Sequence, residues 1–458
     1  MTSIPKPAQN LGKKYQTPQI LRGGWYATWG VSLLLLAISI WGVNSQRQAI
    51  KTVGKDAAPS VLTAQQLQDS FAGMDASLAS ELLLKPGDPR QKEVEIDFQT
   101  NRKKIAARVV AAAKNITYPP EQEIVEKLQR ADGDYLLKLQ EARDAHRRGD
   151  SVAALSIYQS AATLMDEKIL PKAEELSQVN LQQLEEIYAL QRTVNGGTGF
   201  FMAIVGLAQI AILVTIQLFL YQRMRRMLNL PLLGATAIAI IFLGYTIISF
   251  VGATNNLKVA KEDAFNSLHA LRQMRALSYR ANADESRYLL DRVNAPQHER
   301  SFNDKIKKIL TIPPTLTTET VVSNTLQNIK TPGLTGLLSE GLNNITFTGE
   351  KELAIETLKS FNEYVKIDTQ IRQLASSGKL PEAIALCLGT KPSESNGAFD
   401  RYKNIHTKLM DLNKKEFDRN IELGNDRLAN FEIIASVALG SVAILTLAGL
   451  RPRLVEYL

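Results

Sequence analysis

Four stretches of the chain are almost purely apolar, and the residues between them are polar, charged and rich in helix-forming types. The four stretches are Trp25–Val43, Phe200–Leu220, Leu230–Val251 and Phe431–Leu450. None of them contains Lys or Arg, and Glu432 is the one acidic residue among them. Because roughly 20 residues of helix cross a hydrocarbon core of about 30 Å, the pattern predicts four membrane-spanning helices.

The segment between the first two stretches carries a helical pattern. Its apolar residues recur at helical spacing in the series Leu62, Leu67, Phe71, Met74, Leu78 and Leu82. Pro- and Gly-containing breakers at 85–89, 118–120 and 149–150 divide the segment into four helices. Four helices that leave and re-enter one membrane face form an up-down-up-down bundle, so this segment is predicted to be a four-helix bundle.

The segment between the last two stretches repeats this plan with an insertion. Tyr135 precedes Gly149 by 14 residues, and Tyr364 precedes Gly378 by the same 14. Residues 312–349 are rich in Thr, Asn, Gly and Pro and form the predicted insertion. The order of these matches indicates an internal duplication of the unit span–bundle–span.

The predicted fold class is therefore an all-α integral membrane protein with four transmembrane helices and two extracytoplasmic helical bundles that arise from an internal duplication. The expected domains are a cytoplasmic arm at 1–24, a first transmembrane helix at 25–43, a first bundle at 44–199, a second transmembrane helix at 200–221, a basic cytoplasmic linker at 222–229, a third transmembrane helix at 230–251, a second bundle at 252–430, a fourth transmembrane helix at 431–450 and a cytoplasmic tail at 451–458.

The net charge of +8 fixes the expected orientation. The excess is confined to the N-terminal arm, the linker and the tail, and basic residues concentrate on the cytoplasmic side of spans. We expect a multi-pass protein of the cell membrane with both termini in the cytoplasm, and no nucleic-acid partner. A cleaved signal peptide is the alternative for the first stretch, but its apolar core is longer than usual and no clean cleavage site follows Val43.

The sequence carries little that indicates catalysis. Its single cysteine, Cys387, excludes an intramolecular disulfide and is expected to pack in a core. The four histidines have no metal-binding spacing, and no nucleotide-binding or nucleophile motif occurs. The predicted cytoplasmic segments are too short for a kinase, cyclase or phosphatase domain. We therefore expect no enzyme activity, no cofactor and no metal.

One helix after the third span carries the most suggestive chemistry. Arg272, Arg275 and Tyr279 share one face, and Asp284 and Glu285 follow them. Arginines near acids and amides are suited to clamp a carboxylate ligand or a partner loop. The alternative is a solvated helix face with i,i+4 ion pairs.

Two further sets of polar residues have expected roles at the membrane. Gln209 and Gln217 lie on about one face of the second span and are expected to hydrogen-bond between spans. The residues expected to set orientation or to present a cytoplasmic signal are Arg223, Arg225, Arg226, Arg451, Arg453 and Tyr457.

Several segments resemble a known family. They are the basic linker Arg223–Asn229 with Leu232–Thr236, Ala281–Ser286, Ala383–Gly389 with Phe399 and Asp400, and the ending Gly449–Tyr457. Together with the layout of the chain, they resemble the GlnX-type four-span bacterial membrane proteins, whose tandem extracytoplasmic four-helix bundles are similar to chemoreceptor-type sensor domains. The resemblance implies an extracytoplasmic solute-binding protein for glutamine or a related amino acid, and a soluble serine/threonine kinase of the PknG type inside.

The function expected from these features is that of a receptor-like transducer. It would sense an extracytoplasmic ligand or ligand-loaded binding protein, with amino-acid sensing implied by the resemblance, and pass the signal to a separate kinase. Its expected partners are the lipid bilayer, these two proteins and, by analogy with chemoreceptors, a second copy of the chain. The alternatives are a scaffold of an envelope complex and a transporter subunit, and the missing intramembrane charges disfavour transport.

Overall fold

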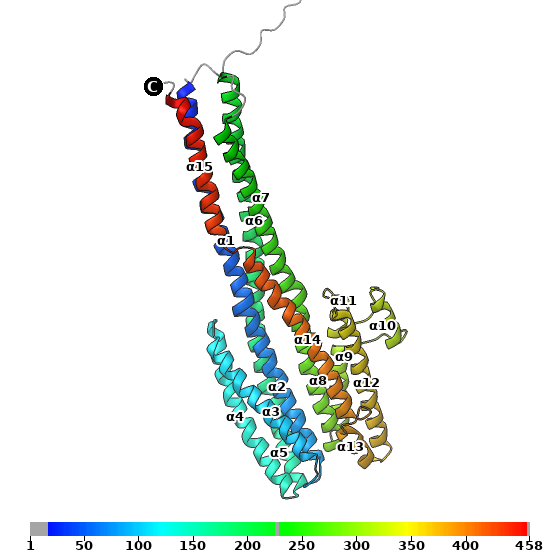
Figure 1. Cartoon of the computed structure of the whole chain (residues 1–458). Coiled ribbons are helices and arrows are strands. Elements are labelled where there is room, and N and C mark those ends of the chain that lie inside the picture. The colour runs from blue at the N-terminus through cyan, green and yellow to red at the C-terminus, as the bar shows by residue number, and fades with distance from the viewer. Residues whose placement is uncertain (1–16, 225–228, 456–458) are drawn as a thin grey trace, which may run out of the picture. The chain divides into compact units, whose positions relative to one another are not determined.

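A computed structural model describes residues 17–224 and 229–455 of the chain, and these residues are helical almost throughout (Figure 1). Among them, the one extended pairing is an isolated bridge between Thr311 and Thr335. The helices, including three short π-helices written η, are α1 (Thr17–Lys51), η1 (Thr52–Ala57), α2 (Ala58–Leu83), α3 (Gln91–Lys114), α4 (Pro119–Arg147), α5 (Ser151–Leu164), η2 (Met165–Ile169), α6 (Leu170–Met224), α7 (Leu230–Lys258), η3 (Val259–Phe265), α8 (Asn266–Leu290), α9 (Ala295–Ile309), α10 (Thr318–Leu326), α11 (Leu337–Asn343), α12 (Glu350–Ser376), α13 (Leu380–Leu388), α14 (Ser395–Asp426) and α15 (Phe431–Val455).

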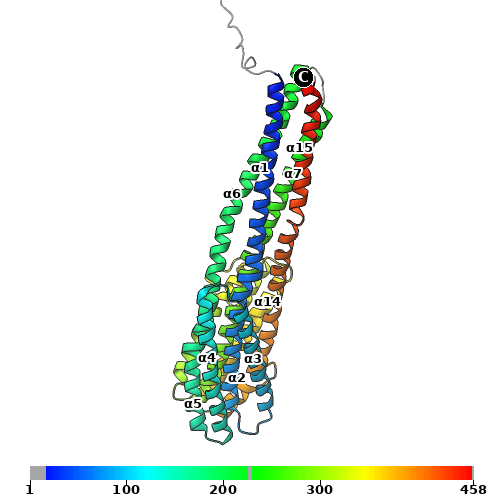
Figure 2. The ribbon, with the colours of Figure 1, turned by 90° about the vertical axis from the view of Figure 1, so that its left-hand side faces the viewer.

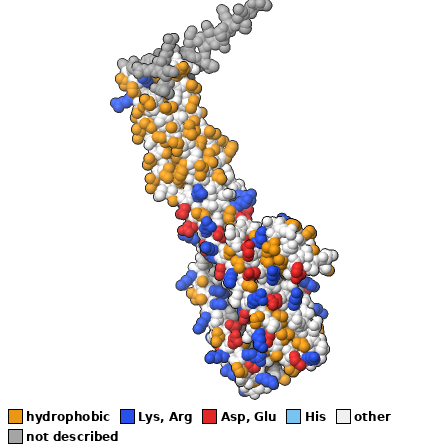
Figure 3. Space-filling model, turned by 45° about the vertical axis from the view of Figure 1, so that its right-hand side comes forward, with side chains coloured by type: hydrophobic (Ala, Val, Ile, Leu, Met, Phe, Trp, Pro, Cys, Tyr) orange, Lys and Arg blue, Asp and Glu red, His pale blue; other side chains and the backbone are white. Residues whose placement is uncertain are grey.

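The chain divides into two compact units. The first, called here the apolar unit, consists of Met1–Lys51, Ile187–Leu257 and Glu422–Leu458. The second, called the polar unit, consists of Thr52–Glu186 and Lys258–Ile421. In Figure 3, apolar side chains gather over the helices of the apolar unit, whereas Lys, Arg, Asp and Glu side chains are scattered over the polar unit.

The apolar unit is built from α1, α15 and the apolar parts of α6 and α7. The four helices that contain these parts are long and apolar enough to cross a membrane, as the hydropathy pattern predicted. Polar side chains join them: Gln209 Nε2 donates to Ser32 Oγ at 2.9 Å, and Gln217 Nε2 donates to Thr236 Oγ1 at 2.9 Å. The predicted hydrogen bonds between these helices are therefore confirmed. The described chain is all-helical and has four helices suited to cross a membrane.

The polar unit is organised around α2. This helix packs along α3 on one side and along α8 on another, and α4 and α5 pack together nearby (Figures 1 and 2). Buried residues of the first segment, such as Phe71 and Leu78, form a core on which Tyr279 and Leu290 of the second segment also pack. The two segments predicted as separate bundles thus share one compact unit, because the long helices α2 and α8 bury their faces against each other.

The ends of the helices follow local sequence signals. Helix α2 ends at Leu83, directly before the predicted breaker at 85–89. Gly149 and Gly378 both have φ of +80°, which glycine adopts without a Cβ penalty. Gly149 follows the end of α4, and Gly378 follows the end of α12. The predicted insertion 312–349 contains the short helices α10 and α11.

Candidate functional site

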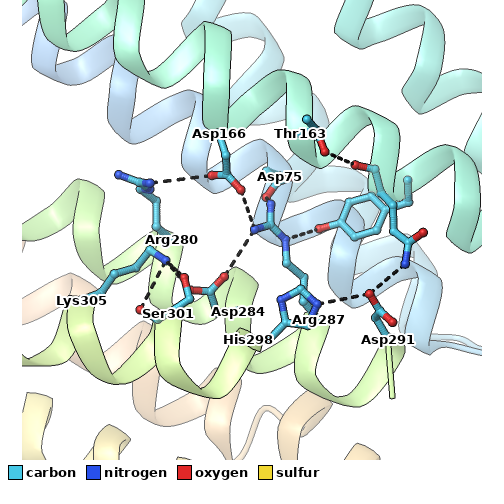
Figure 4. Close-up of polar contacts among 12 residues, drawn as sticks. Asp75, Thr163, Asp166, Arg280, Asp284, Arg287, Asp291, His298, Ser301 and Lys305 are labelled. Atoms are coloured by element: carbon cyan, nitrogen blue, oxygen red, sulfur yellow. Dashed lines mark hydrogen bonds and ion pairs between the residues drawn. The ribbon is translucent and has the colours of Figure 1, made fainter. Parts of the chain in front are cut away.

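The most densely charged place in the polar unit surrounds Arg287 of α8. Its guanidinium donates to Asp75 of α2 at 2.6 Å and to Asp166 of η2 at 2.9 Å (Figure 4). It also donates to Asp284 on its own helix at 3.3 Å and, through Nε, to the Tyr158 hydroxyl of α5 at 3.0 Å. One arginine therefore links three helices of the first segment to the second segment. We call these five residues the Arg287 cluster.

A second ring of polar residues supports the Arg287 cluster. Lys305 of α9 donates to Asp284, and Arg280 lies 3.8 Å from Asp166. At the other end, Asp291 accepts from Gln159 of α5 at 2.8 Å and lies 3.4 Å from His298 of α9 (Figure 4). An open groove of about 390 Å³ runs along these side chains. The carboxylates of Asp166, Asp284 and Asp291 in this groove each have a cation or amide partner already, whereas Glu167 at its edge is exposed.

Burial and neighbouring charge set the protonation of this cluster. Burial raises the pKa of Asp75 above its ordinary value, although Arg287 opposes the rise. Burial would also raise the pKa of Asp166, but Arg287 and Arg280 outweigh it and hold the pKa below the ordinary value. Burial disfavours the charge of Arg287. Asp75 and the surrounding anions nevertheless keep the pKa of Arg287 well above the usual range. A buried arginine with several anions is costly to disrupt, since losing one partner leaves an uncompensated charge.

The α8 segment that supplies the cluster is buried on every side. All nine residues from Ala281 to Leu289 are buried, and they include both small residues and polar or charged ones. Small residues such as Ala281 and Ala283 let neighbouring helices approach, and the polar residues between them find partners on those helices. The interpretation of this stretch as a solvated face is therefore wrong for Asp284 and Glu285, which are 1% and 0% exposed.

The predicted site residues are brought into one unit but not into one site. Arg272 pairs with Asp69 of α2 at 3.2 Å, whereas Arg275 donates to the Lys403 carbonyl of α14 at 2.7 Å. Tyr279 packs edge-on against Phe399 with ring centroids 5.6 Å apart. Within the chain, the two arginines therefore bond to other helices, and their predicted role toward a carboxylate ligand or a partner loop stays a prediction.

Glu285 belongs to a separate buried cluster. Its Oε1 accepts from Ser395 at 2.7 Å and from Cys387 Sγ at 3.4 Å. Burial, together with the nearby carboxylate of Asp368, raises the pKa of Glu285 to about 8. Asp368 in turn holds Arg372 at 2.8 Å. Cys387 is buried, as its expected core role predicted, and burial raises the pKa of its thiol well above the usual value, which makes it a poor nucleophile.

Reasoning from the sequence missed most of the Arg287 cluster. Asp75, Asp166 and Lys305 lie far from the singled-out helix in sequence, and each occurs in an ordinary helical pattern. One signal was present for Asp75. It follows Phe71 and Met74 on the apolar side of its helix and precedes Leu78, and an acid in that position requires a buried partner.

The residues expected at the cytoplasmic side are only partly described. Arg225, Arg226 and Tyr457 lie outside the described residues. Arg223 falls in the last turn of α6, and Arg451 and Arg453 fall in the last turns of α15.

The described residues carry no cluster of metal-binding side chains. Within 17–224 and 229–455, no group of three or more His, Cys, Asp or Glu side chains is placed to hold a metal ion. The Arg287 cluster instead joins helices through ion pairs between their side chains.

Comparison with known proteins gives one match. Residues 49–189 match the model of the actinobacterial sensor domain, which covers η1 to the start of α6 and includes Asp75, Tyr158 and Asp166. No curated protein matches the chain, and no solved structure matches it. The match indicates a sensing or signalling role and favours a non-catalytic one.

Proposed function

We propose that the chain is a transmembrane signal transducer whose polar unit senses an extracytoplasmic ligand or solute-binding protein. The observation that carries the proposal is the sensor-domain match, because the matched residues supply Asp75 and Asp166 to the Arg287 cluster. The sensor segment is thereby bonded to the second segment of the polar unit. A stimulus that favours one packing of these helices over another shifts the balance between two states.

Long helices give the signal a route. Helix α6 (Leu170–Met224) contains residues of both units without a break. The π-helices η1 and η3 occur where α1 and α7 pass into the polar unit, and π-helical turns are frequent at functional sites in helices. Small shifts or rotations of such helices are an established way to carry a switch.

The proposed topology and partners follow from the charge pattern and the family resemblance. Both termini and the linker 222–229 would lie in the cytoplasm, and a separate serine/threonine kinase would read the signal there. An amino-acid-binding protein would act on the polar unit from outside. The specific GlnX-type assignment remains part of this proposal, since the sensor-domain match is to a broader family.

We also propose that the two segments of the polar unit arose by duplication. Corresponding contacts support it. Asn115 donates to the Asp56 carbonyl and contacts Ser60, and Asn344 does the same with Asp263 and Ser267.

A second pair of contacts supports the same correspondence. Glu121 accepts from the backbone of Thr117 and Tyr118, and Glu350 accepts from that of Thr346 and Phe347. The helix after the first or third span is shifted by 207 residues between the copies, and the later helices by 229.

Affinity capture tests the transducer. The full-length protein is captured from gently crosslinked native membranes, with and without added amino acids, and its partners are identified by mass spectrometry. Recovery of an amino-acid-binding protein and a serine/threonine kinase, with a kinase yield that changes on addition, is expected. Recovery of envelope proteins alone, with no change, would instead indicate a scaffold.

A further inference from the structure

A second depression in the polar unit lies among α2, α3, α8 and α14, apart from the groove at the Arg287 cluster. It is a cavity of about 160 Å³ and is more enclosed than that groove. A cavity of about 150 Å³ holds a molecule the size of benzene. The space exists because α2 presents only small residues to it, namely Gly73, Ala76, Ser77 and Ser80.

The cavity is lined by charges of both signs. Asp97 and Lys104 lie seven residues apart on α3 and therefore face the same side of it. On α14, Lys403 pairs with Asp400 at 2.5 Å. Among the described residues, neither Asp97 nor Lys104 has an ion-pair partner within 4.0 Å. Both side chains are exposed, so one acid and one base without an ion-pair partner in the described chain stand at the edge of one small cavity.

The energetic state of these two groups agrees with their lack of partners. Burial raises the pKa of Asp97, and Lys403 only partly offsets it. Burial lowers the pKa of Lys104, and the cations Arg108 and Arg275 add to that effect. A ligand that carries both an ammonium and a carboxylate has the charges to pair with both groups at once.

An amide and two rings complete the lining. Asn282 of α8 is 6% exposed, and its side-chain nitrogen makes no hydrogen bond of acceptable geometry to a described residue, although the side chain lies close to the Tyr364 hydroxyl. Lys403 Nζ lies 5.7 Å from the Tyr279 ring and 5.4 Å from the Phe399 ring.

The groove at the Arg287 cluster occupies the corresponding place of the second copy. With the 207-residue shift, Ser77 corresponds to Asp284 and Ser80 to Arg287. In the second copy these positions carry the ion pairs that satisfy the groove. In the first copy they carry two small hydroxyl side chains, which leave space for the cavity, and Asp97 and Lys104 at its edge have no ion-pair partner in the described chain.

We propose that this cavity binds a small zwitterion of the amino-acid class, with its carboxylate toward Lys104 and Lys403 and its ammonium toward Asp97. The proposal deepens the sensing function and rests on it for its biological meaning, but the binding itself is measurable separately. It assigns direct ligand recognition to residues of both segments.

Binding is measured by isothermal titration of the purified full-length protein with serine, glutamine, glutamate and phenylalanine. We expect at least one of them to bind, and its N-acetyl and methyl-ester derivatives to bind about tenfold more weakly or worse, because each lacks one charge. Asp97→Asn and Lys104→Gln are expected to weaken binding by about tenfold or more.

Two further kinds of variant make the test specific. Ser77→Leu fills the cavity without removing a charge and is expected to abolish binding. Lys103→Gln on the same helix and Asp134→Asn on α4 change exposed charges outside the cavity and are expected to bind as the wild type does. Circular dichroism of each variant confirms that it is folded.

The outcomes separate this proposal from the transducer. If none of the four amino acids binds, or if the blocked derivatives bind equally well, the zwitterion site is wrong. A stimulus-dependent kinase yield in affinity capture would then still support the transducer. If amino acids bind with the expected variant pattern while no kinase is captured, the binding site is supported and the transducer proposal is contradicted.

Discussion

Under the proposed duplication, the Arg287 cluster and the cavity beside Ser80 occupy corresponding places, and their charged side chains are arranged differently. At the first, Arg287 satisfies Asp75, Asp166 and Asp284 within the chain. At the second, Ser80 shares only a hydroxyl–hydroxyl contact of 3.2 Å with Ser286. The two places use the same pair of helices, α2 and α8.

The difference shows how one helical framework can supply both rigidity and a site. Charges that are matched internally hold two helices together and exclude further ions. Charges that are left unmatched next to small residues keep an energetic reason to accept a ligand. A stimulus at the cavity would act on the helices that the Arg287 cluster joins.

The largest effect is expected from removing Arg287. Arg287→Ala leaves Asp75 buried without its counter-charge, whereas Asp284 keeps Lys305, and breaking a buried pair in this way costs about 3–5 kcal/mol. Hydrogen-exchange mass spectrometry should show faster exchange in α2 and α8. Arg300→Ala removes an exposed arginine of α9 and should leave exchange there unchanged.

A double variant distinguishes charge from packing at the Arg287 cluster. Arg287→Met with Asp75→Asn removes both charges and keeps much of the volume, so protection in α2 and α8 should be partly restored. No recovery would mean that the loss in Arg287→Ala does not come from the unpaired charge of Asp75.

A moderate effect is expected at Glu285, which differs from the Arg287 cluster in being held neutral. Its pKa is about 8 in the folded protein against 4.5 for the free group. Between these values the folded state binds a proton that the unfolded state has lost, so the contribution to stability falls as pH rises from about 4.5 to about 8. Glu285→Gln stays neutral throughout.

Melting followed by circular dichroism at pH 5, 6, 7 and 8 checks this sign. The melting temperature should fall more from pH 5 to pH 8 for wild type than for Glu285→Gln. The exposed control Glu356→Gln should show the same fall as wild type. Parallel curves for wild type and Glu285→Gln would show that Glu285 ionises normally. Circular dichroism is needed because all three tryptophans, Trp25, Trp29 and Trp41, lie in α1 of the apolar unit.

The smallest effect is expected at Ser80, which corresponds to Arg287 under the proposed duplication. Ser80→Ala removes one neutral hydrogen bond and should cost about 1 kcal/mol, well below the cost at Arg287. Hydrogen exchange in α2 and α8 measures both variants in one experiment. Equal costs at the two positions would contradict the contrast between a matched cluster and an open cavity.

The sequence predicted the helices well because their signals are local. Apolar stretches of about 20 residues mark the helices of the apolar unit, and the breaker at 85–89 marks the end of α2. The hydrogen bonds of Gln209 and Gln217 followed from the cost of an amide in an apolar helix.

The candidate site was less accessible because its contacts are distant in sequence. Asp75 and Arg287 are separated by 212 residues, and helical periodicity identifies a buried face without naming its partner. For the same reason, the singled-out residues Arg272, Arg275 and Tyr279 were placed on the right helix but assigned to an outside ligand or loop, whereas Arg272 and Arg275 bond to other helices of the chain.

The central claim is that both segments form one sensing unit through direct contact of α2 with α8, and cysteine crosslinking tests it most directly. Ser80→Cys and Ser286→Cys are introduced together with Cys387→Ala, since Cys387 Sγ lies 3.9 Å from the Ser286 hydroxyl. Native membranes are oxidised, and the disulfide-linked peptides are identified by mass spectrometry. Ser160→Cys, on the exposed side of α5, replaces Ser80→Cys in the control. The account predicts a disulfide between positions 80 and 286 and none between 160 and 286; free thiols at 80 and 286 after oxidation would contradict it.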